Sequence, residues 1–250
     1  MEFAAIARFA LLLVRPGMVV MVTPAFGGAH LPAPVKVGLT VLLALGLLPS
    51  VVSDPSTGAS LTAIIAREVA IGLSLAFVLR ALVAGAELAG HLSGFQIGFS
   101  YGATIDPQSG VRNNMLATLY GLMATLAFLA INGHHMVLRA LSASYVALPI
   151  GGGSVNESLV GSVRDILGFV FVIGARIAAP IIIVLLVVEV AVGIIARSSP
   201  SLSFMVIGYP IRIVVGLLLL AALVPTIPAV TNSLLDSALV MAASTAAAFR

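Results

Sequence analysis

Few side chains in this sequence are of the types that carry out chemistry, and their spacing suits it poorly. His134 and His135 are adjacent, so on a helix they would point about 100° apart, and no Asp, Glu or Cys lies near them in the sequence. The stretch 151–154 is Gly-Gly-Gly-Ser, which lacks the lysine and the preceding strand of a phosphate loop and is better interpreted as a turn. Serines and histidines are too dispersed for a triad. The sequence therefore predicts no catalytic residue, no metal site and no cofactor.

Charged residues within apolar stretches suggest a second kind of chemistry, the proton or ion relay of a secondary transporter. Glu87 and Glu189 would carry the protons in such a relay. The alternative is that the charges are buried pairs and contacts between neighbouring helices or subunits. We favour contacts, because the charges are scattered over several helices without a repeated motif. The five charges assigned to such contacts are Arg80, Glu87, Arg176, Glu189 and Arg212.

The amino-acid composition indicates that the chain lies in apolar surroundings. Of 250 residues, 60% are hydrophobic and 8% are charged, whereas soluble domains have about 25% charged residues. The core of a single 250-residue chain cannot bury so much apolar surface, so lipid or other hydrophobic subunits must cover the rest of that surface. The net charge of +3 comes from single, scattered residues, which excludes a nucleic-acid patch, and the absence of cysteine excludes disulfides. The chain is predicted to be an integral membrane protein.

Long apolar runs predict an all-α membrane protein with about six to seven kinked hydrophobic helices. The runs are continuous rather than alternating, which argues against a closed β-barrel. Segments rich in Pro, Gly and capping residues separate them and form the expected turns. An Ala-rich tail, 231–250, would be the seventh helix. The six predicted helical stretches are 3–22, 35–52, 61–89, 115–145, 166–196 and 204–230.

Small residues recur at every fourth position at the end of the third stretch. Ala86, Gly90, Gly94 and Gly98 would lie on one side of a helix and would let another backbone approach closely. We expect tight helix packing there.

The loop after these glycines is polar and compact. Asp106 precedes Pro107, which favours a turn, and Gly110 permits a tight bend. From its residues alone the loop is either a simple helix connection or a pore-lining, gating element. Its residues are Ile105, Asp106, Pro107, Gln108, Ser109, Gly110, Val111, Arg112, Asn113, Asn114 and Met115.

Several motifs, taken in order, resemble the FliR family of flagellar export-gate proteins and their injectisome relatives, the T subunits. They span nearly the whole chain, and the part after residue 165 also resembles the two-helix subunit FliQ. The motifs are Arg15-Pro16, Thr23-Pro24-Ala25-Phe26-Gly27, Pro32-Ala33-Pro34-Val35-Lys36, Gly85-Ala86-Glu87-Leu88-Ala89-Gly90, Gly94-Phe95-Gln96-Ile97-Gly98, Ile105-Asp106-Pro107-Gln108-Ser109-Gly110, Asn132-Gly133-His134-His135 and Gly208-Tyr209-Pro210.

This resemblance implies one domain over 1–250, with a FliP-like part at about 1–165 and a FliQ-like helical hairpin at 166–250. It implies helical hairpins assembled with FliP-like and FliQ-like subunits into a pore in the bacterial inner membrane, near FlhA-like and FlhB-like components. Unfolded flagellar proteins would be the export substrates, and the loop Ile105 to Met115 would be a plug. The alternatives are an injectisome T subunit and a proton-coupled transporter.

Overall fold

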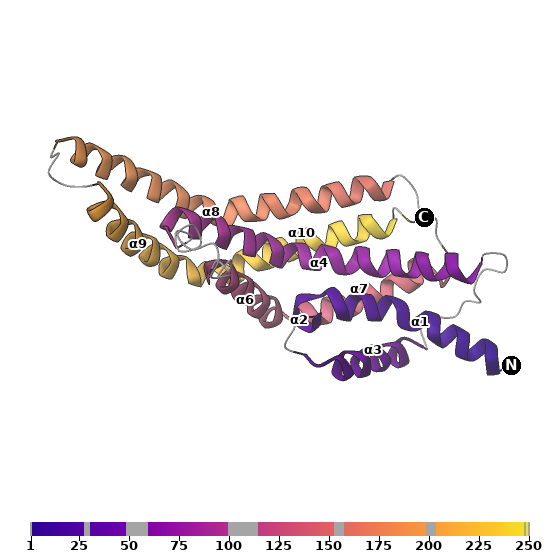
Figure 1. Ribbon diagram of the computed structural model, residues 1–250. Helices are drawn as coiled ribbons and strands as arrows, with labels where there is room; N and C mark the ends of the chain where they lie inside the picture. The colour runs from indigo at the N-terminus through magenta and orange to yellow at the C-terminus, as the bar shows by residue number, and fades with distance from the viewer. Residues whose placement is uncertain are drawn as a thin grey trace. The chain divides into compact units, whose positions relative to one another are not determined.

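A computed structural model describes residues 2–27, 31–48, 60–99, 115–152, 158–198, 204–247 and 249. Regular secondary structure within these ranges is entirely helical (Figure 1). The predicted all-α class is therefore confirmed. Residues 105–114 of the predicted plug loop lie outside the described residues.

The described part of the chain forms helices of very different lengths. The longest, α4 and α8, have 37 and 41 residues. The elements are α1 (Glu2–Val22), α2 (Pro24–Gly27), α3 (Ala33–Leu47), α4 (Leu61–Ile97), α6 (Met115–Ala130), α7 (Gly133–Ala147), α8 (Ser158–Ser198), α9 (Phe204–Leu223), the 3-10 helix η2 (Val224–Thr226) and α10 (Ile227–Ala247).

The stretch predicted as one helix at 115–145 is two helices, α6 and α7. Asn132 separates them with a left-handed φ of 59°, and its N–H donates to the Leu129 carbonyl at 3.1 Å. A Cβ on Gly133 would lie 2.4 Å from the Phe128 ring, so the break requires glycine there. The Asn-Gly pair therefore ends one helix and begins the next.

Helix α4 continues past Ala89, where the sequence predicted its end. It stops at Gly98, whose φ of 106° is left-handed and whose N–H donates to the Gly94 carbonyl at 3.1 Å. The Phe99 N–H donates to the same carbonyl at 2.9 Å. This is a glycine cap at the C-terminus of the helix. Gly90 and Gly94 are helical and buried, and Gly90 packs against α6.

The chain divides into two compact units. Unit 1 comprises Met1–Leu82, Phe128–Gly168 and Asn232–Arg250, and unit 2 comprises Val83–Ala127 and Phe169–Thr231. Helices α4 and α8 contribute residues to both units. The predicted FliP-like part (1–165) and FliQ-like part (166–250) divide the chain differently from these two units. That division is based on resemblance and stays a prediction.

In unit 1, α1 packs against α3 and the first half of α4. Helices α1 and α3 lie side by side (Figure 1), and a Cβ on Gly17 would sit 3.6 Å from the Thr40 methyl. A Cβ on Gly72 would lie 3.0 Å from the Arg15 Cα, so α1 and α4 approach closely at that point. This close approach places Arg15 of α1 beside α4.

In unit 2, the end of α4 packs with α6, α8 and α9. Glycines let these helices approach: a Cβ on Gly85 would lie 2.6 Å from Ile173, and one on Gly216 would lie 2.6 Å from Ile97. The buried core of this unit includes Ala89, Ile97, Leu116, Tyr120, Ala178, Ile181 and Leu185.

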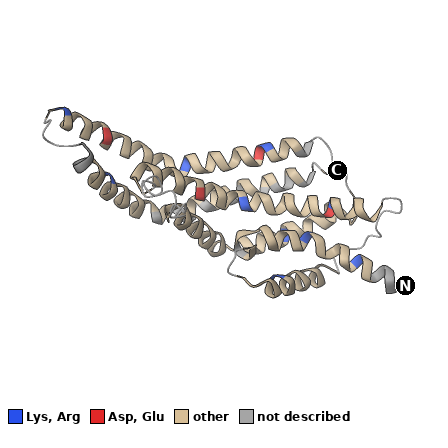
Figure 2. Cartoon of the chain, viewed as in Figure 1, with Lys and Arg blue, Asp and Glu red and all other residues tan. Residues whose placement is uncertain are grey.

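Two helices of the described residues are long and apolar enough to cross a membrane, namely Leu61–Ile97 and Val160–Ser198. The bent pair α6 and α7 makes a third if it counts as one span. Charged residues are few along the helices (Figure 2). Length and hydropathy therefore make this a membrane protein, as the composition predicted.

Candidate functional site

A buried ion pair joins α1 and α4 in unit 1. The Arg15 and Glu68 side chains are both 0% exposed. The Arg15 Nε donates to Glu68 Oε2 at 2.5 Å, and Nη2 donates to Glu68 Oε1 at 3.0 Å. This two-pronged geometry fixes the orientation of both side chains as well as their distance.

Further contacts bind the remaining polar atoms of Arg15 and Glu68. We call the whole group the Arg15 cluster; its members are Arg15, Glu68, Ser144, Tyr145 and Gly151. Arg15 Nη1 donates to the Ser144 carbonyl at 3.1 Å, and the guanidinium carbon lies 4.4 Å from the centroid of the Tyr145 ring. The Gly151 N–H donates to Glu68 Oε1 at 3.1 Å. The cluster thus ties α1, α4, α7 and the turn after α7 together.

Neighbouring bonds hold the same elements. The Tyr145 hydroxyl donates to the Leu12 carbonyl at 3.0 Å, and Arg67 Nη1 donates to the Gly151 carbonyl at 3.2 Å. Both polar groups of Gly151 are therefore bound by the adjacent residues Arg67 and Glu68. The Arg15 cluster positions helices, and no described group in it is left exposed to bind a ligand.

Sequence reasoning did not select the Arg15 cluster. Arg15 and Glu68 lie in two of the predicted helical stretches, but 53 residues separate them and no periodicity joins them. The available signal was an arginine followed by Pro16 within the first apolar run. A buried arginine of that kind requires a carboxylate elsewhere in the fold.

In unit 2 the structure brings two of the predicted charges together. Arg212 Nη2 of α9 lies 2.9 Å from Glu189 Oε1 of α8, with the side chains 14% and 40% exposed. The guanidinium carbon also lies 5.7 Å from the centroid of the Tyr209 ring. The pair joins the two arms of the α8–α9 hairpin, and each charge offsets the other within apolar helices.

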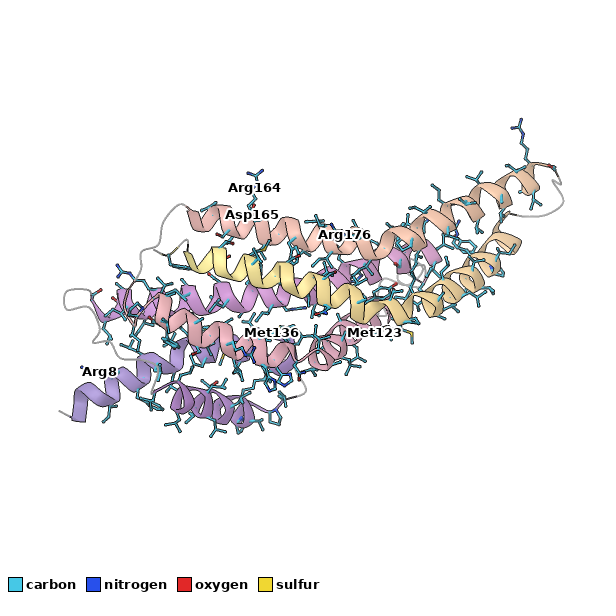
Figure 3. The ribbon with its side chains drawn as sticks, turned by 180° about the vertical axis from the view of Figure 1, so that it is seen from behind. Arg8, Met123, Met136, Arg164, Asp165 and Arg176 are labelled. Atoms are coloured by element: carbon cyan, nitrogen blue, oxygen red, sulfur yellow. The ribbon has the colours of Figure 1, made fainter. Side chains whose placement is uncertain are left out.

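The other predicted charges lie at separate places. Arg80 and Glu87 are half-buried on α4, and a Cβ on Gly121 of α6 would lie 3.0 Å from Glu87 Oε1. Arg176 is exposed on α8 (Figure 3), and within the described residues it has no ion-pair or hydrogen-bond partner.

The small-residue series lies where α4 meets other helices of unit 2. A Cβ on Gly90 would lie 2.5 Å from the Ala117 Cα and 2.6 Å from the Leu116 carbonyl oxygen of α6. Ala86 packs with Val83 and Ala124, and Gly94 is buried. Gly98 faces the Tyr209 ring, 3.6 Å from where its Cβ would be.

The ends of α4 and α6 border an open apolar groove in unit 2, with a volume of about 560 Å³. Phe99 and Met115, the last and first described residues on either side of 100–114, both line it. Met115 is the one member of the predicted plug loop among the described residues. The other lining residues are Leu116, Thr118, Leu119, Leu122, Leu217 and Leu220.

The two adjacent histidines of α7 have rings whose centroids are 4.3 Å apart, tilted by 49°. Among the described residues, no group of three His, Asp or Glu side chains could hold a metal ion.

Comparisons with known proteins match most of the chain. A model of the family "Bacterial export proteins, family 1" matches residues 6–238. The chain is 31% identical over 217 residues to the flagellar biosynthetic protein FliR of Escherichia coli (strain K12), covering 86% of this chain and 83% of that protein. It is 29% identical over 225 residues to FliR of Pectobacterium carotovorum subsp. carotovorum, with 89% and 86% covered. It is 28% identical over 217 residues to FliR of Bacillus subtilis (strain 168), with 85% and 84% covered.

Proposed function

This chain belongs to the FliR family of bacterial export proteins, which makes it a membrane component of the flagellar export apparatus, and we propose that it is a core subunit of the export gate. In this role it is not an enzyme. It forms the secretion pore in the bacterial inner membrane with FliP-like and FliQ-like subunits, near FlhA-like and FlhB-like components. Unfolded flagellar proteins pass through that pore, and other parts of the apparatus supply the energy.

The observation that carries this proposal is the uncovered apolar surface of α8. The helix has 41 residues and is about 60 Å long at about 1.5 Å per residue, whereas the hydrocarbon core of a bilayer is about 30 Å thick. Large apolar side chains stay exposed along it, among them Phe171, Val187 and Ile194. A single bilayer cannot cover the whole length of this surface, which supports cover by other hydrophobic subunits.

The α8–α9 hairpin supports the proposed division of the chain. Residues 166–250 would be a FliQ-like hairpin joined to a FliP-like part at about 1–165. The ion pair between Glu189 and Arg212 holds the two arms of this hairpin. A proton-coupled transporter would need Glu189 to load and release protons, so a carboxylate held by arginine favours the contact role.

The loop 105–115 is proposed as the plug that closes the pore at rest. The support comes from the residues at the two ends of this segment. Phe99, before it, and Met115, its last residue, both line one open apolar groove, which could take up apolar side chains of the loop.

Deleting residues 106–114 from the assembled gate should open a leak. Removal of a plug leaves the pore without its closure, so the ion current through the complex in a planar bilayer should rise well above that of the unaltered complex. A matched control removes residues 154–156, which begin at the last residue of the turn predicted at 151–154, and should leave the current unchanged. Equal currents for both deletions would contradict the assignment of this loop as the plug.

A further inference from the structure

Helix α1 of unit 1 contains a proline in its interior. Pro16 is buried, and α1 continues across it from Glu2 to Val22. In a regular helix the N–H of residue 16 donates to the carbonyl of residue 12, four positions earlier. Because proline has no N–H, the Leu12 carbonyl loses its donor within α1. Leu12 is only 2% exposed, so this carbonyl needs a donor from elsewhere in the protein.

A side chain of α7 supplies a donor at this carbonyl. The Tyr145 hydroxyl donates to the Leu12 carbonyl at 3.0 Å, and Tyr145 is 3% exposed. The two residues are 133 positions apart in the sequence, so the bond forms only when α7 packs against α1. A buried carbonyl without a donor lowers the stability of a fold, and the Tyr145 hydroxyl prevents that loss.

The ring of Tyr145 makes a separate contact next to the proline. It lies 4.4 Å from the guanidinium carbon of Arg15, measured to the ring centroid. Phenylalanine at position 145 would keep the ring beside Arg15 and would lose only the hydroxyl. The substitution Tyr145→Phe therefore isolates the hydrogen bond to Leu12 from the contact with Arg15.

Leu12 lies where α1 enters the interior of unit 1. Residues 6–10 are mostly exposed, with Ile6 at 67%, whereas residues 11–20 are buried or half-buried. A hydrogen bond at Leu12 therefore acts at the start of the buried part of α1. The helical turns before and around Leu12 are the first to open if this bond is lost.

We propose that Tyr145 replaces the donor that Pro16 removes, and that this bond fixes the first half of α1 to unit 1. Pro16 and Tyr145 are then a coupled pair, because the hydroxyl is required only where the proline is present. With an N–H at position 16, α1 would bond its own Leu12 carbonyl and the hydroxyl would be dispensable. The inference does not depend on the gate role, since it concerns a contact within this chain.

Hydrogen exchange of α1 in the purified full-length chain tests the coupling. Tyr145→Phe should raise the amide exchange rate of residues 6–14 by about five- to thirtyfold, because this part of α1 opens more often without the bond. Pro16→Ala supplies the missing N–H. The double variant Pro16→Ala with Tyr145→Phe should therefore exchange within about twofold of Pro16→Ala alone.

Two further substitutions control for general effects. Tyr120→Phe removes the hydroxyl of another buried tyrosine, which lies in unit 2, and should leave the exchange of residues 6–14 unchanged. Pro180→Ala restores an N–H at the interior proline of α8 and should not reverse the effect of Tyr145→Phe. Reversal by Pro180→Ala as complete as that by Pro16→Ala would show that the two effects are general.

Thermal unfolding gives a second measurement of the same pair. Tyr145→Phe should lower the unfolding temperature by about 2–8 °C, and this loss should be mostly absent when Pro16→Ala is also present. The proposal is overturned if Tyr145→Phe changes neither the exchange nor the unfolding temperature. It is also overturned if Tyr145→Phe has the same effect with alanine at position 16 as with proline.

Discussion

Replacing Glu68 with glutamine should lower the free energy of unfolding by about 3–5 kcal/mol, the largest loss expected for any single substitution in the described residues. Both Arg15 and Glu68 are 0% exposed, so removing the carboxylate leaves an uncompensated cation inside unit 1. The Gly151 N–H would also face an amide in place of a carboxylate oxygen. The measurement is the thermal unfolding temperature of the purified chain in detergent, together with its steady amount in membranes.

A double variant and a surface control complete this test. Arg15→Met with Glu68→Leu removes both charges and should regain most of the lost stability, because apolar pairs of similar volume often replace buried ion pairs at little cost. Arg139→Gln changes an exposed arginine of α7 and should shift stability by less than about 0.5 kcal/mol. A double variant as unstable as Glu68→Gln would contradict the ion-pair account of the Arg15 cluster.

The second large effect concerns Gly90, where α4 meets α6 in unit 2. Gly90→Ala should cost about 1–3 kcal/mol, because its Cβ would lie 2.5 Å from the Ala117 Cα and the backbone of α6 would have to move. Valine at the same position should cost more. Thermal unfolding of the purified chain measures both substitutions.

Gly193→Ala is the matched control for this substitution. Gly193 also lies inside a helix of unit 2, but a Cβ there would meet nothing within 4 Å. Alanine has the higher helix propensity, so this variant should be as stable as the parent or about 0.5–1 kcal/mol more stable. Equal losses at Gly90 and Gly193 would show that the close approach of α4 and α6 is not what Gly90 provides.

Hydropathy and turn chemistry predicted the helices well where one signal dominated. The predicted stretch 3–22 became α1, and α4 begins at Leu61 as predicted, whereas the stretch 204–230 ends as a helix at Leu223 and its last residues begin α10. Predictions failed where two signals conflicted. Asn132 and Gly133 lie within a continuous apolar pattern, yet the left-handed φ of Asn132 divides it. The third apolar stretch was predicted to end at Ala89, yet α4 continues to Ile97, and Gly90 packs against α6.

The polar contacts were harder to predict, because they depend on long-range geometry. Glu189 and Arg212 were both selected as contacts, and the structure pairs them between α8 and α9. The pairing of Arg15 with Glu68 depends on the close approach of α1 to Gly72, which no local pattern reveals. Arg176 was selected as a contact as well, but no described residue pairs with it.

Co-purification with FliP-like and FliQ-like subunits from the same genome tests the gate role most directly. The three proteins are expressed together, only this chain carries an affinity tag, and the complex is weighed by native mass spectrometry after detergent extraction. The gate role predicts one stable complex that contains all three subunits, with several copies of each partner. Recovery of this chain alone, under conditions in which the FliP-like and FliQ-like subunits assemble with each other, would contradict it.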